Sequence, residues 1–467
     1  MAEARLPTVV VRGGTVVGAD RAERGDVLVE GGRIVAIGPG IEVPRGSSVL
    51  DAGGCLVGPG LVDLHAHLRE PGHEEAETIE TGSRAAALGG YSAVVAMANT
   101  DPPIDHPAAV RAVAELAKGA LVEVAVAGAI TKGRAGERLA PLAEMAALGV
   151  RIFSDDGRGV QHAGLMRRAL EYARPLGVLL AQHCEDEDLV AGGVMHEGAW
   201  SSRLGLPGQP ALAEESMLAR DLDLVRLTGA PMHFLHLSTA RSVELVRRAR
   251  AEGLPVTAEA TPHHLTLTDA EVAGFDPLYR VNPPLRPAAD VAAVRAGLLD
   301  GTIDAVATDH APHAPDSKEL PFDQAPPGMI GLETALSVAY GALCLGPEED
   351  VPGWLRAVAE PDAPSPRRSQ APPVPRLAGA VELFRLMSSR PAAISGLDAR
   401  GGHGGPLAPG ARGHLCVFDP GERWRVDPGA GASRSANTPF ASRELVGRVR
   451  HVLVAGEPVV VGGEAQR

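Results

Sequence analysis

The chain has 467 residues, of which 45% are hydrophobic and only 3% aromatic, and it carries a net charge of −14. This length is enough for one large catalytic domain and a smaller one, and the absence of a basic cluster argues against nucleic-acid binding. No apolar run is long enough to cross a membrane, and the N-terminus lacks the apolar core of a signal peptide.

Both ends of the chain have the pattern of short β-strands. Residues 8–57 alternate apolar segments with turn signals such as Gly13-Gly14 and Gly31-Gly32, which is typical of all-β structure, and the C-terminal segment looks similar. The predicted strands are Thr8–Arg12, Asp26–Glu30, Arg33–Ile37, His414–Phe418 and Arg450–Gly456. We therefore predict one small β-sandwich domain built from both termini, residues 1–57 and 401–467.

The middle of the chain, residues 58–400, alternates strands and helices. The apolar segments predicted as strands are Leu61–Leu64, Ser92–Ala98, Val122–Ile130, Val150–Ser154, Val178–Gln182, Met232–Leu237, Val256–Ala260 and Asp304–Thr308. Helical patterns lie between most of them, for example at Pro107–Lys118, Leu165–Ala173 and Ala240–Ala251. Eight strand–helix units in succession predict an α/β fold, a (β/α)8 TIM-like barrel with insertions.

One segment, residues 359–378, fits neither pattern. It is low in complexity and rich in proline, with the run Ala371-Pro-Pro-Val-Pro375 near its end. We predict a flexible surface loop or a disordered insertion there, and the sequence does not reveal its role.

The most informative stretch is Asp63-Leu-His-Ala-His-Leu-Arg69, at the end of the first predicted barrel strand. Residues two apart in a strand point to the same face, so His65 and His67 are expected to project together, as two ligands of one metal ion must. Arg69 lies on the same side if the strand continues that far. A lone His-x-His pair is weak support because most such pairs bind no metal, so the other strands decide the case.

Residue types that bind metals stand at the ends of five predicted barrel strands. A barrel builds its chemistry at the C-terminal ends of its strands, which meet at one rim. The residues found there are His65, His67, Asp156, His183, His236 and Asp309. Each alone has an ordinary explanation, such as a helix cap for Asp156 or a core histidine for His183, but six at one rim are not expected by chance.

Four imidazoles and two carboxylates suit Zn²⁺, with Mn²⁺, Fe²⁺ and Co²⁺ as competitors. Two ions about 3.5–4 Å apart that share Asp156 would use all six ligands. A single ion with an open position for water is the simpler arrangement. The sequence therefore predicts one or two Zn²⁺ ions per chain and leaves the number open.

The same residues match a known family. Over nearly its whole length the chain resembles the class I dihydroorotases of the amidohydrolase superfamily. The motifs that carry the resemblance are Asp63–Gly72, Glu77–Gly82, Ala85–Gly90, Ala307–His313, Ala325–Glu333 and Asn437–Phe440. Together these motifs are highly specific.

The resemblance implies a role for each matching residue. Asp156 would bridge or ligate, and Asp309 would ligate and shuttle the proton. The histidine pairs that would each bind one ion are His65 with His67 and His183 with His236. The residues that would hold the substrate, chiefly by its carboxylate and ring amides, are Arg69, Asn99, Asn282 and His313, with Pro327 and Gly328 in a loop that offers backbone contacts.

The implied reaction is the zinc-dependent hydrolysis of the cyclic amide of dihydroorotate to N-carbamoyl-aspartate, and the reverse ring closure in pyrimidine biosynthesis. Zn²⁺ lowers the pKa of bound water to roughly 7 and polarises the carbonyl. Asp309 would take a proton from the attacking water and give it to the leaving nitrogen. Arg69 would clamp the substrate carboxylate with two hydrogen bonds, a geometry that lysine cannot offer.

The chain departs from the family pattern in two places. Ala98 stands where the family usually has proline, before Asn99. Many relatives bridge two metal ions with a carboxylated lysine at strand four, where this chain has only Asp155 and Asp156, and we assign the ligand to Asp156. Acids and histidines left outside the ligand set are Glu185 and Asp186, expected behind the ligands or at a helix N-terminus, and His263 and His264, which are given no role.

Two other functions have to be weighed. A hydantoinase, dihydropyrimidinase or allantoinase would share the barrel and the histidine pair, but Arg69 and the missing strand-four lysine argue against them. An inactive scaffold that supports aspartate transcarbamoylase would have lost ligands, whereas this chain keeps all six. A homodimer and a complex with the transcarbamoylase both stay open. Four separated cysteines without a CxxC pair favour a reducing cytoplasm.

Overall fold

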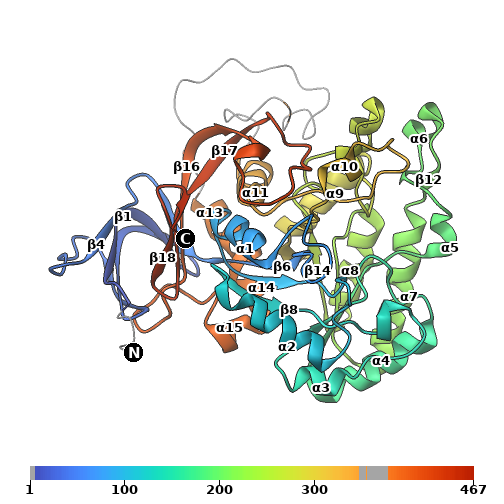
Figure 1. Ribbon diagram of the computed structural model, residues 1–467, viewed down its shortest axis with the longest axis horizontal. Helices are drawn as coiled ribbons and strands as arrows, with labels where there is room; N and C mark the ends of the chain where they lie inside the picture. The colour runs from blue at the N-terminus through green and yellow to red at the C-terminus, as the bar shows by residue number, and fades with distance from the viewer. Residues whose placement is uncertain (1–5, 346–353, 355–376, 467) are drawn as a thin grey trace.

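The computed structural model describes residues 6–345, 354 and 377–466. The predicted proline-rich insertion, 359–378, lies outside the described residues except for its last two positions. Figure 1 shows two units, a β-sandwich in which the first and last parts of the chain lie side by side and a barrel formed by the middle.

The sandwich is formed by one sheet in which the strands from the C-terminal end of the chain lie together on one side and those from the N-terminal end lie together on the other. Its order is β19-β18-β17-β16-β5-β1-β2-β3, with β4 paired to β1. The strands are β1 (Val9–Val17), β2 (Ala22–Glu30), β3 (Arg33–Gly38), β4 (Ser48–Asp51), β5 (Leu56–Pro59), β16 (Leu415–Arg425), β17 (Glu444–Val454), β18 (Glu457–Val461) and β19 (Glu464–Ala465). The antiparallel pair β5–β16 joins the two ends. The predicted β-sandwich from both termini is therefore confirmed, while the boundaries 1–57, 58–400 and 401–467 stay a prediction.

Apolar residues on alternate positions give the sandwich its own core. Val9, Val11, Val27, Val29 and Val417 are all buried in one cluster. β-branched residues at every second position of a strand place their side chains on one face of the sheet.

The barrel contains all eight predicted strands. They are β6 (Leu61–Ala66), β7 (Tyr91–Ala96), β8 (Glu123–Val126), β9 (Ile152–Phe153), β10 (Leu179–Gln182), β13 (Met232–Phe234), β14 (Val256–Ala260) and β15 (Ala305–Val306). Parallel pairing gives the orders β6-β7-β8 and β15-β14-β13-β10-β9. Two further parallel bridges, Gly128 to Phe153 and Ala66 to His310, close the circle. This confirms the predicted (β/α)8 architecture.

Helices follow the barrel strands. They are α1 (Ile79–Leu88), α2 (Pro107–Leu116), α3 (Leu142–Ala146), α4 (Ala163–Leu176), α7 (Leu212–Thr228), α8 (Ala240–Ala251), α9 (Ala288–Leu299) and α11 (Ala335–Leu343). Their ends follow local chemistry: the Thr239 side chain accepts from the Ser242 amide to begin α8, and Gly177 ends α4 in a left-handed conformation.

Insertions after two of the barrel strands and three C-terminal helices complete the fold. After β10 the chain forms α5 (Glu187–Val190), β11 (Met195–His196), α6 (Ala199–Leu204) and β12 (Gly208–Gln209), and after β15 it forms the single turn α10 (Pro315–Lys318). The last helices are α13 (Leu377–Phe384), α14 (Arg390–Ser395) and α15 (Leu397–Gly401). Within the described ranges, no helix has both the length and the apolar composition needed to cross a bilayer.

Candidate active site

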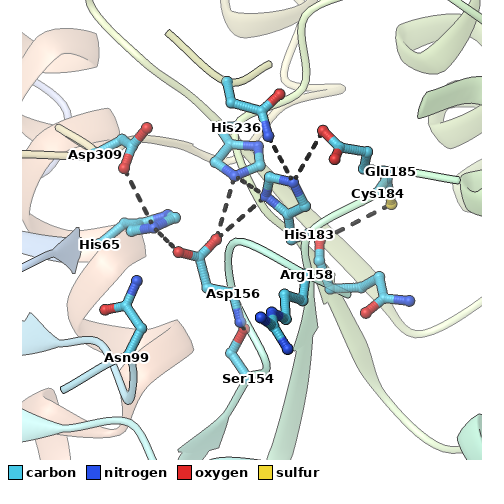
Figure 2. Close-up of polar contacts among 12 residues, drawn as sticks. His65, Asn99, Ser154, Asp156, Arg158, His183, Cys184, Glu185, His236 and Asp309 are labelled. Atoms are coloured by element: carbon cyan, nitrogen blue, oxygen red, sulfur yellow. Dashed lines mark hydrogen bonds and ion pairs between the residues drawn. The ribbon is translucent and has the colours of Figure 1, made fainter. Parts of the chain in front are cut away.

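Asp156 lies at the centre of the barrel rim, and each of its carboxylate oxygens faces a different pair of histidines. Figure 2 shows one oxygen directed at His65 and the other at His183 and His236. Oδ2 is 3.4 Å from Nε2 of both His65 and His67. Oδ1 is 3.4 Å from Nδ1 of His183 and from Nε2 of His236. All five side chains are buried. Two groups of ligand atoms therefore share one carboxylate, as in a pair of metal ions bridged by an aspartate.

Several of these atoms need a partner that the protein itself does not supply. Nε2 of His65 and Oδ1 of Asp156 are buried without a hydrogen bond to any described residue, although buried polar atoms are nearly always satisfied. Nδ1 of His183 and Nε2 of His236 face each other at 2.9 Å. Imidazole nitrogens with carboxylate oxygens suit Zn²⁺ and similar divalent ions. The residues present thus fit a binuclear metal centre.

Asp309, directly after the last barrel strand, closes the centre on the side of the first histidine pair. Its Oδ1 is 3.0 Å from Nε2 of His67 and 3.5 Å from Nε2 of His65. Burial alone would raise the pKa of Asp309, but the neighbouring His65 and His67 outweigh it and hold the pKa well below its usual range. The carboxylate is therefore ionised.

Behind the histidines, further polar side chains fix the direction of the rings. Nδ1 of His65 is 2.9 Å from Oε1 of Glu259, and the other Glu259 oxygen is 3.0 Å from Nε2 of His233. Burial would raise the pKa of Glu259, but the bonds from His233 and His65 lower it to about 2. Nδ1 of His67 is 2.8 Å from Oδ1 of Asn99. These contacts leave Nε2 of His65 and of His67 directed at Asp156, as a metal ligand requires.

The two neighbouring aspartates have different surroundings. Asp155 accepts hydrogen bonds from the amides of Ile130 and Thr131 at 2.9 and 3.1 Å and from the Thr131 hydroxyl. It therefore holds the chain after β8, whereas Asp156 faces the histidines. Among the other acids, Glu185 Oε2 is 3.4 Å from Nε2 of His183, and Asp186 caps α5.

Arg69 reaches the rim by a turn rather than along the strand. The condition under which Arg69 would share a strand face with His65 and His67, that the strand continues that far, is not met, because β6 ends at Ala66 and Arg69 has a φ of 61°. His236 and Asp309 also have positive φ, 32° and 47°. Side chains other than glycine rarely adopt this conformation, and such strain gathers at functional sites. Nε of Arg69 donates to the Pro312 carbonyl at 3.0 Å.

The remaining predicted substrate residues lie around the same rim. Nδ2 of Asn282 is 3.4 Å from Nε2 of His183. Nε2 of His313 donates to the Pro327 carbonyl at 2.9 Å. Burial and then Arg69 lower the pKa of His313 to about 3, so its ring is neutral. Gly328 follows with a φ of 137°, and a Cβ there would come within 2.8 Å of the His313 ring.

Sequence reasoning missed three residues that hold the site together. Glu259 could have been noticed as the one acidic side chain inside an apolar strand, Val256–Ala260. Asn437 was quoted only as part of a motif, yet its Oδ1 accepts from the His313 amide at 3.1 Å and its Nδ2 donates to the Gly328 carbonyl at 3.1 Å. Arg134 donates to the Asp156 carbonyl, and no sequence signal pointed to it.

The two histidines that were given no role end the seventh barrel strand. His264 is tied into the loop by Thr261 Oγ1 at 2.8 Å and by the Pro283 carbonyl at 3.1 Å, which is a structural arrangement. His263 is buried, and its Nε2 has no hydrogen-bond partner among the described residues.

Comparisons with known sequences all match this chain to dihydroorotases. The family described as "Dihydro-orotase-like" matches residues 54–242. A dihydroorotase from Pelotomaculum thermopropionicum is 46% identical over 454 residues, covering 97% of this chain and 98% of the relative. A dihydroorotase from Mycobacterium tuberculosis is 46% identical over 460 residues, covering 98% of this chain and 99% of the relative.

Solved structures agree on the fold. The L-hydantoinase (dihydropyrimidinase) from Arthrobacter aurescens has a TM-score of 0.82 at 24% identity, covering 99% of this chain and 98% of that structure. The D-hydantoinase (dihydropyrimidinase) from Thermus sp. has a TM-score of 0.77 at 25% identity, covering 98% of this chain and 96% of that structure. Both carry the same combination of barrel and sandwich.

Proposed function

The chain belongs to the dihydroorotase family of metal-dependent cyclic amidohydrolases, and from that premise we propose how its own residues act on dihydroorotate. The reaction is hydrolysis of the ring amide to N-carbamoyl-aspartate and the reverse ring closure. The observation that carries the proposal is Asp156, with one oxygen toward His65 and His67 and the other toward His183 and His236.

We assign the metal positions to these five residues and to Asp309, and Zn²⁺ is the ion that the ligand set favours, at one or two per chain. When bound, the ions polarise the amide carbonyl and lower the pKa of water to roughly 7. Glu259 and Asn99 keep the rings of His65 and His67 in the orientation that this requires.

Asp309 is the proton carrier. Its ionised carboxylate takes a proton from the attacking water as the new C–O bond forms, and gives it to the ring nitrogen as the C–N bond breaks. In ring closure it moves the proton in the opposite direction. Its position within 3.5 Å of both His65 and His67 supports this role.

Arg69 holds the substrate carboxylate. Its Nε is used by the Pro312 carbonyl, while neither Nη atom has a hydrogen bond to another described residue, so both can face a carboxylate. Asn99 and Asn282, beside the two histidine pairs, and His313 with the Pro327–Gly328 loop complete the substrate site. Binding at fixed orientation over the centre lowers the barrier without a covalent intermediate.

The test measures zinc per chain and dihydroorotate hydrolysis for the wild type and for Asp309→Asn. We expect one to two zinc ions per wild-type chain, and a loss of about 10²–10⁴-fold in turnover for Asp309→Asn. Asp398→Asn, at an exposed position on α15, is the matched control and should keep full activity.

The other outcomes decide between the alternatives. Metal without turnover of dihydroorotate would move the substrate to another cyclic amide, and a panel of hydantoin, dihydrouracil and allantoin would identify it. No metal and no activity would favour the scaffold function. A homodimer, a complex with aspartate transcarbamoylase and a cytoplasmic location stay predictions, and light scattering of the chain alone and mixed with the transcarbamoylase would test the first two.

A further inference from the structure

Lys318, at the end of the single turn α10, is a buried cation that the site described above does not use. Its side chain is only 8% exposed. Buried lysines usually have a carboxylate partner, but within the described residues none lies within 4 Å of its Nζ. The ammonium instead donates to three backbone carbonyls, of Pro277 at 3.1 Å, Arg280 at 3.4 Å and Pro326 at 2.7 Å.

These carbonyls come from two separate segments, and one of them is the loop assigned to the substrate. Pro326 immediately precedes Pro327 and Gly328. The Gly328 amide donates to the Arg280 carbonyl at 2.8 Å, so this carbonyl is shared between the loop and Lys318. The Arg280 guanidinium in turn donates to the Phe322 carbonyl at 2.9 Å. The loop is therefore joined to residues 277–280 in two ways: directly through the Gly328 amide, and through the Lys318 ammonium, which binds Pro326 as well as Pro277 and Arg280.

The contacts of the loop continue to the substrate side. The Pro327 carbonyl accepts from the His313 ring at 2.9 Å. A shift of Pro326 would move Pro327 and Gly328 and free the His313 ring to turn. The ammonium donates to none of the predicted metal ligands, so the first effect of its loss is expected on the loop.

We propose that Lys318 is a positioning residue whose ammonium fastens the Pro327–Gly328 loop and the His313 ring in the orientation that binds the substrate. The inference rests on the proposed function and adds to it a determinant of affinity outside the metal centre. A lysine suits this place because the three N–H donors of its ammonium group point in three different directions. The donors of an arginine guanidinium, in contrast, all lie in one plane.

The bonds from Lys318 to the three carbonyls depend on the charge of its side chain. A protonated amine offers three donors to the three carbonyls, while a neutral amine has two donors and a lone pair that faces a carbonyl oxygen. Burial, then the Arg280 guanidinium, lower the pKa of Lys318 to about 7, against a smaller opposing effect of the Asp276 carboxylate. His313, the other titratable group influenced by Lys318, is neutral across this range because its pKa is about 3. Substrate affinity should therefore fall as the pH rises through 7.

The chain is well suited to a direct test because it has only three lysines, Lys118, Lys132 and Lys318. Selective labelling of lysine side-chain nitrogen in the zinc-loaded wild type gives three signals to titrate by NMR. Lys118→Met is the matched control, since the Lys118 side chain is 70% exposed, and Lys318→Met removes the anchor. KM, kcat and zinc content are measured for each protein between pH 6 and 9.

We expect the Lys318 signal to titrate near pH 7 and the wild-type KM for dihydroorotate to rise over the same range. Lys318→Met should raise KM at pH 6 at least about tenfold, as the loss of hydrogen bonds to a charged group predicts. Its KM should no longer change with pH, while kcat and zinc content stay near the wild-type values. Lys318→Arg should recover only part of the affinity.

Two results would overturn the inference. One is a wild-type enzyme with normal turnover whose KM stays constant through the titration of Lys318. This result is obtained on the wild type alone and does not depend on the folding of a variant. The other is a Lys318→Met enzyme with unchanged KM, or with kcat and zinc lost together. Absence of turnover in the wild type at every pH would contradict the proposed function itself and is distinct from both.

Discussion

The metal-facing and substrate-facing parts of the site are built in different ways. His65 and His67 stand on β6 or directly after it, and a buried side chain behind each ring, Glu259 or Asn99, fixes its direction. Arg69 and His313 lie in loops and are fastened to the backbone carbonyls of Pro312 and Pro327. The metal-facing rings are each fixed by a buried side chain behind them, whereas the substrate-facing side chains lie in loops and bind loop carbonyls.

This difference predicts which measured quantity a substitution in each part should change. Strand ends that meet in a closed barrel fix the ligands relative to one another, so a change there should alter metal content. A loop can shift while the barrel stays intact, so a change there should alter KM alone. The predictions below test this separation.

The largest effect is expected at the residue that both histidine pairs share. Asp156→Asn keeps the size of the side chain but removes the second anionic oxygen, so a pair of ions bridged by this residue would lose its bridge. We expect zinc to fall by about one per chain, and turnover to fall more than about a hundredfold, since even partners behind the ligands contribute 10–100-fold. Elemental analysis with steady-state kinetics measures both. Full zinc content in this variant would contradict a bridging role.

Arg69→Lys should act on affinity instead. Lysine keeps the charge but lacks the two parallel N–H donors of the guanidinium group. The loss of one or two charge-assisted hydrogen bonds should raise KM about 10–100-fold. Zinc content should be unchanged. Arg158→Lys is the control, because Arg158 is exposed beside the same centre (Figure 2). Loss of zinc in Arg69→Lys would contradict the separation of the two parts.

Glu259→Gln tests the support behind the ligands. The carboxylate accepts from both His65 and His233 and its pKa is held at about 2, so it stays ionised at every pH at which the enzyme would be assayed. The neutral amide should weaken the first zinc position about 10–100-fold, with KM little changed once zinc is saturating. Competition with a chelator measures the affinity. An unchanged chelator curve would show that His65 needs no such partner.

Much of the barrel and of the metal-facing part follows from local sequence patterns. Apolar runs of the right length predicted all eight strands, and the helix Ala240–Ala251 begins and ends where predicted. A barrel then brings the strand ends together without further information, so His65, His67, Asp156, His183 and His236 could be grouped before any coordinates were known.

The supporting contacts could not be predicted in the same way, because they join residues far apart in the chain. His65 and Glu259 are 194 positions apart, and His313 and Asn437 are 124 apart. The turn at Arg69 depends on a positive φ that its sequence does not signal, since only glycine and asparagine commonly mark such positions. Lys318 binds carbonyl groups, which every residue has, so no motif reveals its partners.

The smallest effect is expected at Ala98, where the family usually has proline. Its amide makes no backbone hydrogen bond within the described residues, while its carbonyl accepts from the Ile104 amide at 3.1 Å. Ala98→Pro should therefore lose no bond and should restrict the unfolded chain, raising the free energy of unfolding by about 0.4–1 kcal/mol. Turnover should stay within about twofold, because Asn99 would keep its bond to His67. Urea unfolding and steady-state kinetics measure the two quantities. A higher KM, or a loss of zinc, would mean that alanine sets the position of Asn99 and through it the ring of His67, so that this turn belongs with the metal-facing part.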